Sequence, residues 1–199
     1  LNIGIQNLSD ADIQYAKEKN YKIKLVPTTR KISTKQVITF VLPKFVKADD
    51  FLYNVENEYN GVTVQAAFAD KQFFFGKGAG GHPTGAAVLS DIAALRYDYR
   101  YEYKKYKQQN GLIHTDKVSL EVYLRYQHEY TVEKLQIENI SERFSRNDYK
   151  YVIGSVSLKN LLEHKDILVN KDVFIAQTGK ISYSEQDIKA IAEEGELVN

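Results

Sequence analysis

The sequence predicts an α+β fold, with a mixed or antiparallel sheet covered by helices on one face, and a small β-α-β-α-β unit of ferredoxin-like type. Three observations predict this class. Apolar and polar residues alternate in short stretches such as 21–26 and 118–127, which indicates half-buried strands. Segments with apolar residues at helical spacing lie between such stretches. From residue 111 onward, strand and helix patterns alternate along the chain.

The first helix is predicted to begin after Ser9, because Asp12 stands where it completes a capping box. Ile13 and Ala16 are expected to face inward. Asn20 suits the left-handed residue that often ends a helix.

Strands are predicted over 21–26 and 35–46. Lys22 and Lys24 lie on one face of the first strand; alternating lysines are typical of a half-exposed strand, and a catalytic lysine is the alternative. Pro43 restricts the second strand to an edge position, a bulge or its own end. The neighbouring carboxylates Asp49 and Asp50 follow it, and they favour a solvated turn because no further ligand stands nearby.

A hairpin is predicted from two stretches, 63–69 and 71–75, with a turn at Asp70. Its second strand leads into a glycine cluster and then a helical pattern. The cluster comprises Gly76, Gly78, Gly80 and Gly81. Glycine permits positive φ and close approach of a ligand, and a helix N-terminus offers unpaired N–H groups. The corner can therefore hold a polar or anionic group.

Two known phosphate-binding motifs are disfavoured at this corner. The spacing of Gly76, Gly78 and Gly81 matches G-x-G-x-x-G, but that motif needs a parallel strand with an acidic residue about 20 positions on. Asp98 is near that distance but lies in a charged helical segment. No Gly-Lys-Ser/Thr closes the glycine run, so it is not a P-loop. A tight corner that needs glycine only for packing is the alternative.

The helix after Pro83 is predicted to continue to about Gln109, and its last part interleaves tyrosine with arginine and lysine. Such a pattern can bind single-stranded nucleic acid. The formal net charge of +1 instead favours an interface.

Beyond Asn110-Gly111 a second unit is predicted. Its strands are expected over 118–127, 149–156 and 173–177. Ser157 caps a short helix, and a terminal helix follows Ser184. An amphipathic helix is expected through Val132, Leu135, Ile140 and Phe144.

Composition restricts the possible functions. With 199 residues, 43% hydrophobic and 27% charged, the chain suits a globular protein of one or two domains. The absence of cysteine excludes thiolate catalysis and permits a cytoplasmic location. No stretch approaches the ~20 apolar residues of a membrane span. The four histidines do not pair at metal-ligand spacing, and His82 alone stands beside the glycine corner. A start at Leu1, inside a motif, favours a piece of a longer protein.

Three segments, in the right order, resemble homoserine dehydrogenases. GKGAGGHPTGAAVLSDIAAL, residues 76–95, is similar to the family segment G-x-G-A-G-x-x-P-T-x-x-A-V-x-x-D. Residues 4–26, GIQNLSDADIQYAKEKNYKIKLV, and residues 42–61 resemble two earlier segments of the family. Together they cover roughly residues 1–100.

The resemblance implies NAD(P)-dependent interconversion of L-homoserine and L-aspartate 4-semialdehyde, in the biosynthesis of threonine and methionine. Gly80 and Thr84 align with positions that contact NAD or NADP near the nicotinamide, and Gly78 and Ala79, just before them, are also expected to bind the cofactor. The family's Rossmann domain and its catalytic Asp, Lys and Glu precede the region present here. The chain is therefore expected to hold no catalytic residue and no metal, and to be inactive alone.

The implied organisation is a partial catalytic and dimerisation domain over 1–110, an ACT-like regulatory domain over 111–181, and a helix or tail over 182–199. The first strand, with Lys24, would join the dimerisation sheet and the floor of the site. A homodimer or higher homo-oligomer in the cytoplasm is implied, with no nucleic-acid or membrane partner. The alternative is a stand-alone regulatory or dimerisation module that binds a small ligand.

Overall fold

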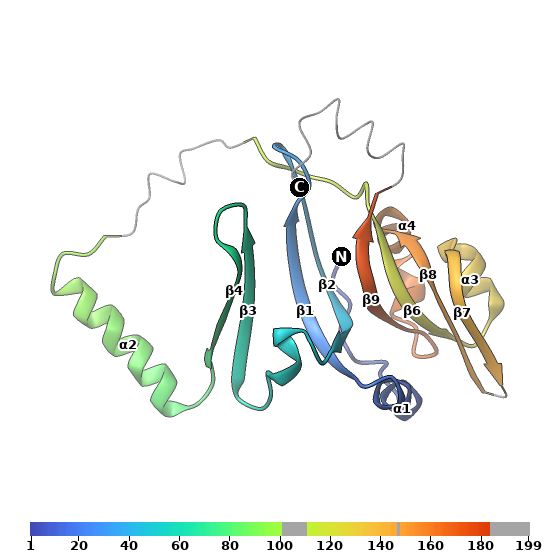
Figure 1. Cartoon of the computed structure of the whole chain (residues 1–199), viewed down its shortest axis with the longest axis horizontal. Helices are drawn as coiled ribbons and strands as arrows, with labels where there is room; N and C mark the ends of the chain where they lie inside the picture. The colour runs from blue at the N-terminus through green and yellow to red at the C-terminus, as the bar shows by residue number, and fades with distance from the viewer. Residues whose placement is uncertain (101–110, 147, 184–199) are drawn as a thin grey trace. The chain divides into compact units, whose positions relative to one another are not determined.

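A computed structural model of the chain describes residues 1–100, 111–146 and 148–183 (Figure 1). Its backbone contacts group Leu1–Val46 with Asn110–Asn199 as one compact unit, here unit 1, and Lys47–Gln109 as a second, unit 2. Unit 2 ends close to residue 110, where the sequence predicts a boundary between domains. Residues 1–46, however, group with the C-terminal part of the chain and not with unit 2. The functional division into catalytic and ACT-like domains stays a prediction.

The C-terminal part of unit 1 has the ferredoxin-like βαββαβ order. Its strands lie in the order β9-β6-β8-β7, and each neighbouring pair is antiparallel. The elements are β6 (Ser119–Tyr126), α3 (Glu129–Leu135), β7 (Glu138–Arg146), β8 (Tyr149–Ser157), α4 (Leu158–Glu163), α5 (Lys165–Leu168) and β9 (Phe174–Ser182).

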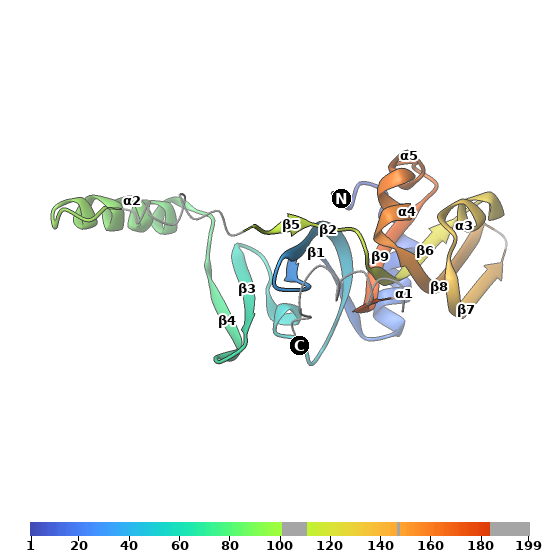
Figure 2. The ribbon, with the colours of Figure 1, turned by 90° about the horizontal axis from the view of Figure 1, so that it is seen from above.

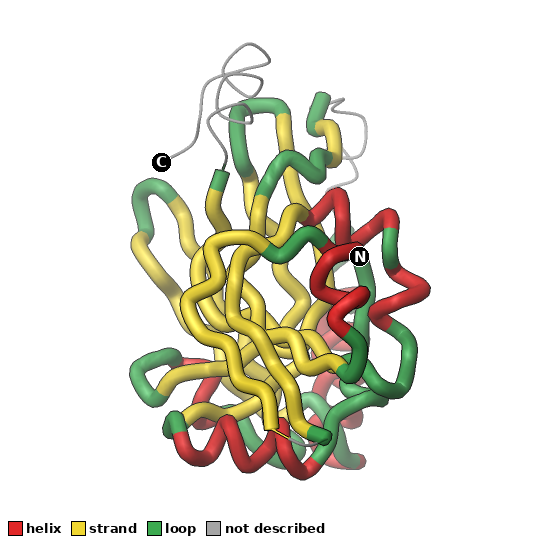
Figure 3. The backbone as a smooth tube through the Cα atoms, turned by 90° about the vertical axis from the view of Figure 1, so that its right-hand side faces the viewer, coloured by secondary structure: helices red, strands yellow, loops and turns green. Residues whose placement is uncertain are grey.

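Both faces of the central strand β6 are buried over most of its length, because alternate residues of β6 enter two different cores. Leu120, Val122 and Leu124 pack on the side of α3 and α4, whereas Tyr123 packs against α1 (Asp10–Glu18). Figures 2 and 3 show helices on both sides of the strand layer. The sequences of β6 and β8 are therefore apolar on both faces over much of their length, whereas β7 is mostly exposed.

Two N-terminal strands extend the same sheet beyond β9. β1 (Tyr21–Lys31) and β2 (Gln36–Lys47) form a hairpin, β2 pairs in parallel with β9 at Lys44↔Gln177, and it also pairs with the short β5 (Ile113–His114). The sheet is thus mixed, as predicted. β2 is not an edge strand; Pro43 lies between the bridge of Val41 to Asn2 and the pair of Lys44 with Gln177.

Helix α1 begins as the sequence predicts. The Ser9 side chain accepts a hydrogen bond from the Asp12 backbone, and the Asp12 side chain accepts one from Ser9, so the capping box is present. Asn20 has φ 56°, the left-handed conformation expected after the helix. The prediction that Ile13 faces inward is wrong, because Ile13 is exposed. Asp12 and Tyr15 are buried instead.

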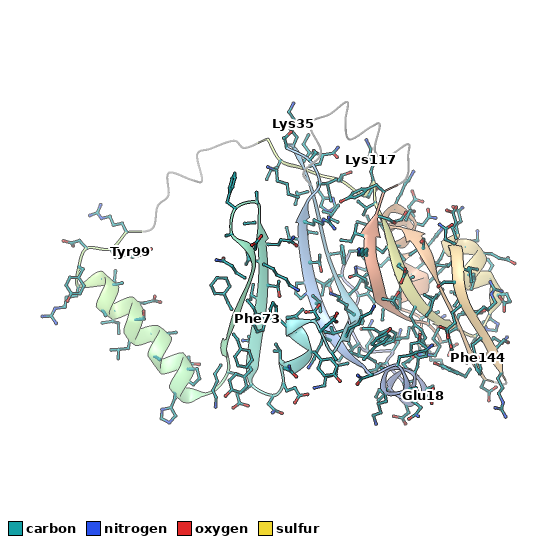
Figure 4. The ribbon with its side chains drawn as sticks, in the orientation of Figure 1. Glu18, Lys35, Phe73, Tyr99, Lys117 and Phe144 are labelled. Atoms are coloured by element: carbon teal, nitrogen blue, oxygen red, sulfur yellow. The ribbon has the colours of Figure 1, made fainter. Side chains whose placement is uncertain are left out.

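Unit 2 contains the 3-10 helix η1 (Phe51–Asn54), a hairpin of β3 (Tyr59–Ala66) and β4 (Asp70–Lys77), and helix α2 (Gly81–Leu95). The hairpin confirms the sequence prediction, and Asp70 has φ 48° at its turn. On one hairpin face Phe73, labelled in Figure 4, stacks on Phe51 with ring centroids 5.3 Å apart. No described residue between 47 and 100 is buried.

Two predicted helices differ from the structure. The segment 132–144 is not one helix: α3 ends at Leu135, Gln136 is left-handed with φ 52°, and the chain continues as β7. Helix α2 ends at Leu95, well before Gln109. The tyrosine-rich segment 101–109 and the helix predicted after Ser184 lie outside the described residues. No described helix is long and apolar enough to span a membrane.

Candidate functional site

The glycine corner joins β4 to α2 and depends on Gly80. This residue is the N-cap of α2, with φ 114° and ψ 158°, a conformation that L side chains rarely adopt. Its carbonyl accepts the first helical hydrogen bond, from Thr84 N–H at 3.1 Å. No side chain caps this end of α2. The first-turn N–H groups of Gly81 and His82 are thus positioned as donors, while Pro83 has none.

Gly78 serves the corner differently, by close packing. A Cβ atom there would lie 1.6 Å from Nδ2 of Asn60, on the partner strand. Gly78 N–H also donates to the carbonyl of Glu58 at 3.1 Å. A side chain at position 78 would therefore have to displace the Asn60 side chain where the chain leaves β4.

The corner borders an open hollow of about 510 Å³. Its lining comes from the end of the hairpin and from the first turns of α2. The residues are Glu58, Lys77, Ala79, Gly80, Gly81, His82, Pro83 and Ala86. Thr84 lies in the same helical turn but does not line the hollow.

One ion pair flanks this hollow. Lys77 Nζ lies 2.8 Å from Glu58 Oε1 and 5.3 Å from the centre of the Tyr59 ring. The hydrogen bond from Lys77 lowers the pKa of Glu58, and the same bond, with Tyr59, raises the pKa of Lys77. Both side chains are close to half exposed, so water screens their attraction. The hollow therefore offers a cation, a carboxylate and backbone donors to a polar ligand.

Of the predicted cofactor-binding residues, Gly78, Ala79 and Gly80 form the corner itself, and Thr84 lies at the end of the first turn of α2. His82 lines the hollow as the second residue of α2. Sequence analysis did not identify Glu58 and Lys77. Lys77 could have been found from its place inside the glycine motif. No sequence pattern marks Glu58, because its contact with Lys77 forms only when β3 and β4 pair.

The carboxylates Asp49 and Asp50 do not form a comparable site. The Asp50 side chain accepts a hydrogen bond from Leu52 N–H at 3.0 Å and so caps η1. Both aspartates line a second hollow, of about 400 Å³, beside Phe51 and Phe73. Within the part of the chain that the structure describes, no group of three or more His, Cys, Asp or Glu is arranged to hold a metal.

The dinucleotide-fingerprint interpretation fails on topology. β4, which precedes the glycines, pairs antiparallel with β3 in a two-stranded sheet, instead of opening a parallel βαβ unit. Fold and corner together define the class: an α+β protein whose glycine-rich strand-to-helix corner can hold a polar ligand.

Comparison with known proteins gives the family. Residues 2–93, which include α1, the β1–β2 hairpin, the β3–β4 hairpin and most of α2, match the family model of homoserine dehydrogenase. Over these residues, slightly less than half of its length, the chain is similar to the homoserine dehydrogenase family.

Individual relatives agree. The chain is 39% identical over 89 residues to homoserine dehydrogenase of Neisseria gonorrhoeae, covering 45% of this chain and 20% of that protein. It is 28% identical over 175 residues to that of Helicobacter pylori, covering 88% of this chain and 40% of the relative. The similarity to the second protein therefore extends well beyond the family segment.

Solved structures show the same fold. A homoserine dehydrogenase from Thiobacillus denitrificans superposes with a TM-score of 0.61 at 20% identity, over 89% of this chain and 47% of that one. Homoserine dehydrogenase of Staphylococcus aureus, solved at pH 7.0, superposes with a TM-score of 0.53 at 23% identity. The match covers 89% of this chain and 46% of that one. The chain thus spans about half the length of these solved relatives.

Proposed function

We propose that this chain is part of an NAD(P)-dependent homoserine dehydrogenase and that its glycine corner holds the nicotinamide end of the cofactor. The observation that carries the proposal is the backbone of Gly80, held at φ 114° at the start of α2 inside the family's glycine motif. Without a side chain, Gly80 lets a flat ring approach the backbone closely. The N–H groups of the first turn are suited to the polar groups attached to that ring.

The reaction would oxidise the alcohol carbon of L-homoserine to the aldehyde of L-aspartate 4-semialdehyde. NAD or NADP would accept the hydride, and the hydroxyl would lose its proton to a base. The base and the substrate-binding groups are expected in the portion of the longer protein that precedes residue 1. The part proposed for this chain is binding and orientation, through Gly78, Ala79, Gly80 and Thr84.

The surface of unit 2 supports a longer parent protein. Val62, Val64 and Phe74 on one hairpin face are 57%, 42% and 58% exposed. On α2, Ile92 and Leu95 are 58% and 70% exposed. Contiguous apolar surface of this kind marks an interface. In the proposed parent, the remaining part of the enzyme covers it.

Residues 111–181 would act as a divergent ACT-like regulatory domain. The ferredoxin-like strand order of β6 to β9 supports this assignment. The same proposal places the parent in the cytoplasm, in threonine and methionine biosynthesis, as a homodimer or higher homo-oligomer.

The test is homoserine-dependent reduction of NAD or NADP by the full parent protein, with Gly80→Ala and Gly85→Ala variants. A Cβ at Gly80 is strained, whereas one at Gly85 meets nothing within 4 Å. The first variant should raise the KM for the cofactor at least about tenfold, equivalent to ~1.4 kcal/mol, and the second should leave it unchanged. Equal effects of the two variants would contradict the assignment of Gly80.

If the parent has no such activity, a stand-alone module that binds a small ligand becomes the better explanation of the chain.

A further inference from the structure

A buried charged cluster in unit 1 joins two segments that are distant in sequence. At its centre is Asp12, on α1, whose side chain is fully buried. Its carboxylate accepts hydrogen bonds from Ser9 N–H at 2.9 Å, Ser9 Oγ at 2.7 Å and Tyr123 Oη at 2.8 Å. Arg125 Nε lies 3.0 Å from both of its oxygens. Each oxygen of the carboxylate thus accepts from at least two donor atoms.

Arg125, on β6, holds two loops in addition to Asp12. Its two terminal nitrogens donate to the carbonyl of Asn7 at 2.7 Å and to the carbonyl of Asp172 at 3.4 Å. The Asn7 side chain in turn donates to the carbonyl of Asn170 at 2.7 Å. One guanidinium therefore fixes the loop before α1 and the loop before β9 to the central strand of the ferredoxin-like sheet.

The directional contacts of Asp12 favour this one position of α1 on the sheet. A buried ion pair is stable when every charged atom has a partner, and removing one partner leaves an uncompensated charge. Sliding α1 along the sheet would separate Asp12 from both Arg125 and Tyr123. Apolar contacts of Tyr15 and Ala16 in the same core tolerate small shifts far better, since they have no direction.

We propose that the Asp12–Arg125 pair is a latch, which holds α1 and the loop before β9 at one position on the ferredoxin-like unit. When the pair is broken, α1 and the start of β1 open locally, while β6 and β8 stay folded. The latch thereby connects the segment that carries the family match to the ferredoxin-like unit. This inference is independent of the proposed enzymatic activity.

The structure supplies a matched control for the latch. Lys19 and Glu142 also join α1 to the ferredoxin-like sheet, at 3.4 Å, but their side chains are 44% and 36% exposed. Exposed pairs contribute little, because water screens the charges and solvates them when they separate. Replacing Lys19 therefore breaks a connection between the same two parts without leaving a buried charge.

The test is hydrogen exchange measured by mass spectrometry on the full 199-residue chain, in the wild type and in Asp12→Asn, Arg125→Lys and Lys19→Gln variants. Asp12→Asn should speed exchange of α1 and the start of β1 by roughly 100-fold or more, with β6 and β8 unchanged. Arg125→Lys keeps the charge but loses the planar fork, so it should open the same segments to a smaller extent. Lys19→Gln should resemble the wild type.

Uniform acceleration across α1, β1, β6 and β8 in Arg125→Lys would mean that the pair supports the whole unit equally, and would overturn the latch. Unchanged exchange in both latch variants would overturn it too. If Asp12→Asn does not fold, the milder Arg125→Lys variant decides between the outcomes.

Discussion

Gly80 and Gly78 differ in why glycine suits them. Gly80 has a positive φ that L side chains rarely adopt, and at Gly78 a side chain would have to displace that of Asn60. Gly76 and Gly81 have no neighbour that a Cβ would meet. The sequence could predict the corner from the clustering of glycines. The sequence could not show at which of these positions a side chain would be unfavourable. The answer depends on the φ angle of each residue and on contacts across the hairpin, which only the structure gives.

A residue-scale prediction concerns the tyrosines of unit 1 at alkaline pH. Burial raises the pKa of Tyr123, Tyr15 and Tyr151 above the ordinary value of 10.0. Because the unfolded chain has the lower pKa, the neutral phenols stabilise the fold below about pH 10, and this stabilisation is lost as pH rises above that value. The last part of the rise in phenolate absorbance, from these buried tyrosines, should therefore coincide with the loss of circular dichroism above pH ~10.

The control for this titration is the chain in denaturant, where the same phenols should ionise near pH 10. Full ionisation of all tyrosines near that pH with the circular dichroism of the native chain intact would contradict the burial of these side chains.

At the scale of single elements, the sequence predicts helix ends well, because capping depends on residues that are close together in the chain. The capping box of Ser9 and Asp12, the left-handed Asn20 and the cap of α4 by Ser157 are all confirmed. The helix predicted over 132–144 is wrong, because its apolar spacing also fits a strand. Ile140, Glu142 and Phe144 alternate along β7, where Phe144 pairs with Tyr151 of β8.

An element-scale prediction concerns the irregularity in β7, where the pairing with β8 shifts between Glu138 and Glu142. Gly154 on β8 makes room for it: a Cβ there would lie 2.6 Å from the carbonyl oxygen of Glu138. Gly154→Ala should lower the free energy of unfolding by about 1–3 kcal/mol, since backbone must move. Chemical denaturation measures this.

Ser155→Ala, at the next and half-buried position of β8, adds no atoms and is the control. A loss no larger in Gly154→Ala than in this control would show that the backbone of β7 adapts without cost.

At the scale of the whole chain, periodicity does not reveal which strands pair. β1 and β2 precede unit 2 in sequence, yet they share a sheet with β6 to β9. This pairing is long-range, so no local pattern encodes it. The helix α2, which is rich in glycine and alanine, has no buried residue in the structure. Its alanines are consistent with packing against a surface of the proposed parent.

A whole-molecule prediction follows from the missing core of unit 2. A two-stranded hairpin is marginally stable at best in water, and here no described residue between 47 and 100 is buried. In the isolated chain, amides of β3 and β4 should exchange with solvent far faster than those of β6 and β8, as hydrogen exchange would measure.

Protection of β3 and β4 that increases with protein concentration would indicate that a second copy covers the apolar faces. Strong protection that is independent of concentration would contradict the view that unit 2 depends on the rest of a longer protein.

The most direct test of the proposed function is the rate of homoserine-dependent NAD or NADP reduction, compared between the parent protein and this 199-residue chain. We expect turnover by the parent, loss of cofactor affinity in its Gly80→Ala variant, and no turnover by the chain alone. A parent without activity, or turnover by the isolated chain, would contradict the assignment of the glycine corner to the nicotinamide end of a site completed elsewhere.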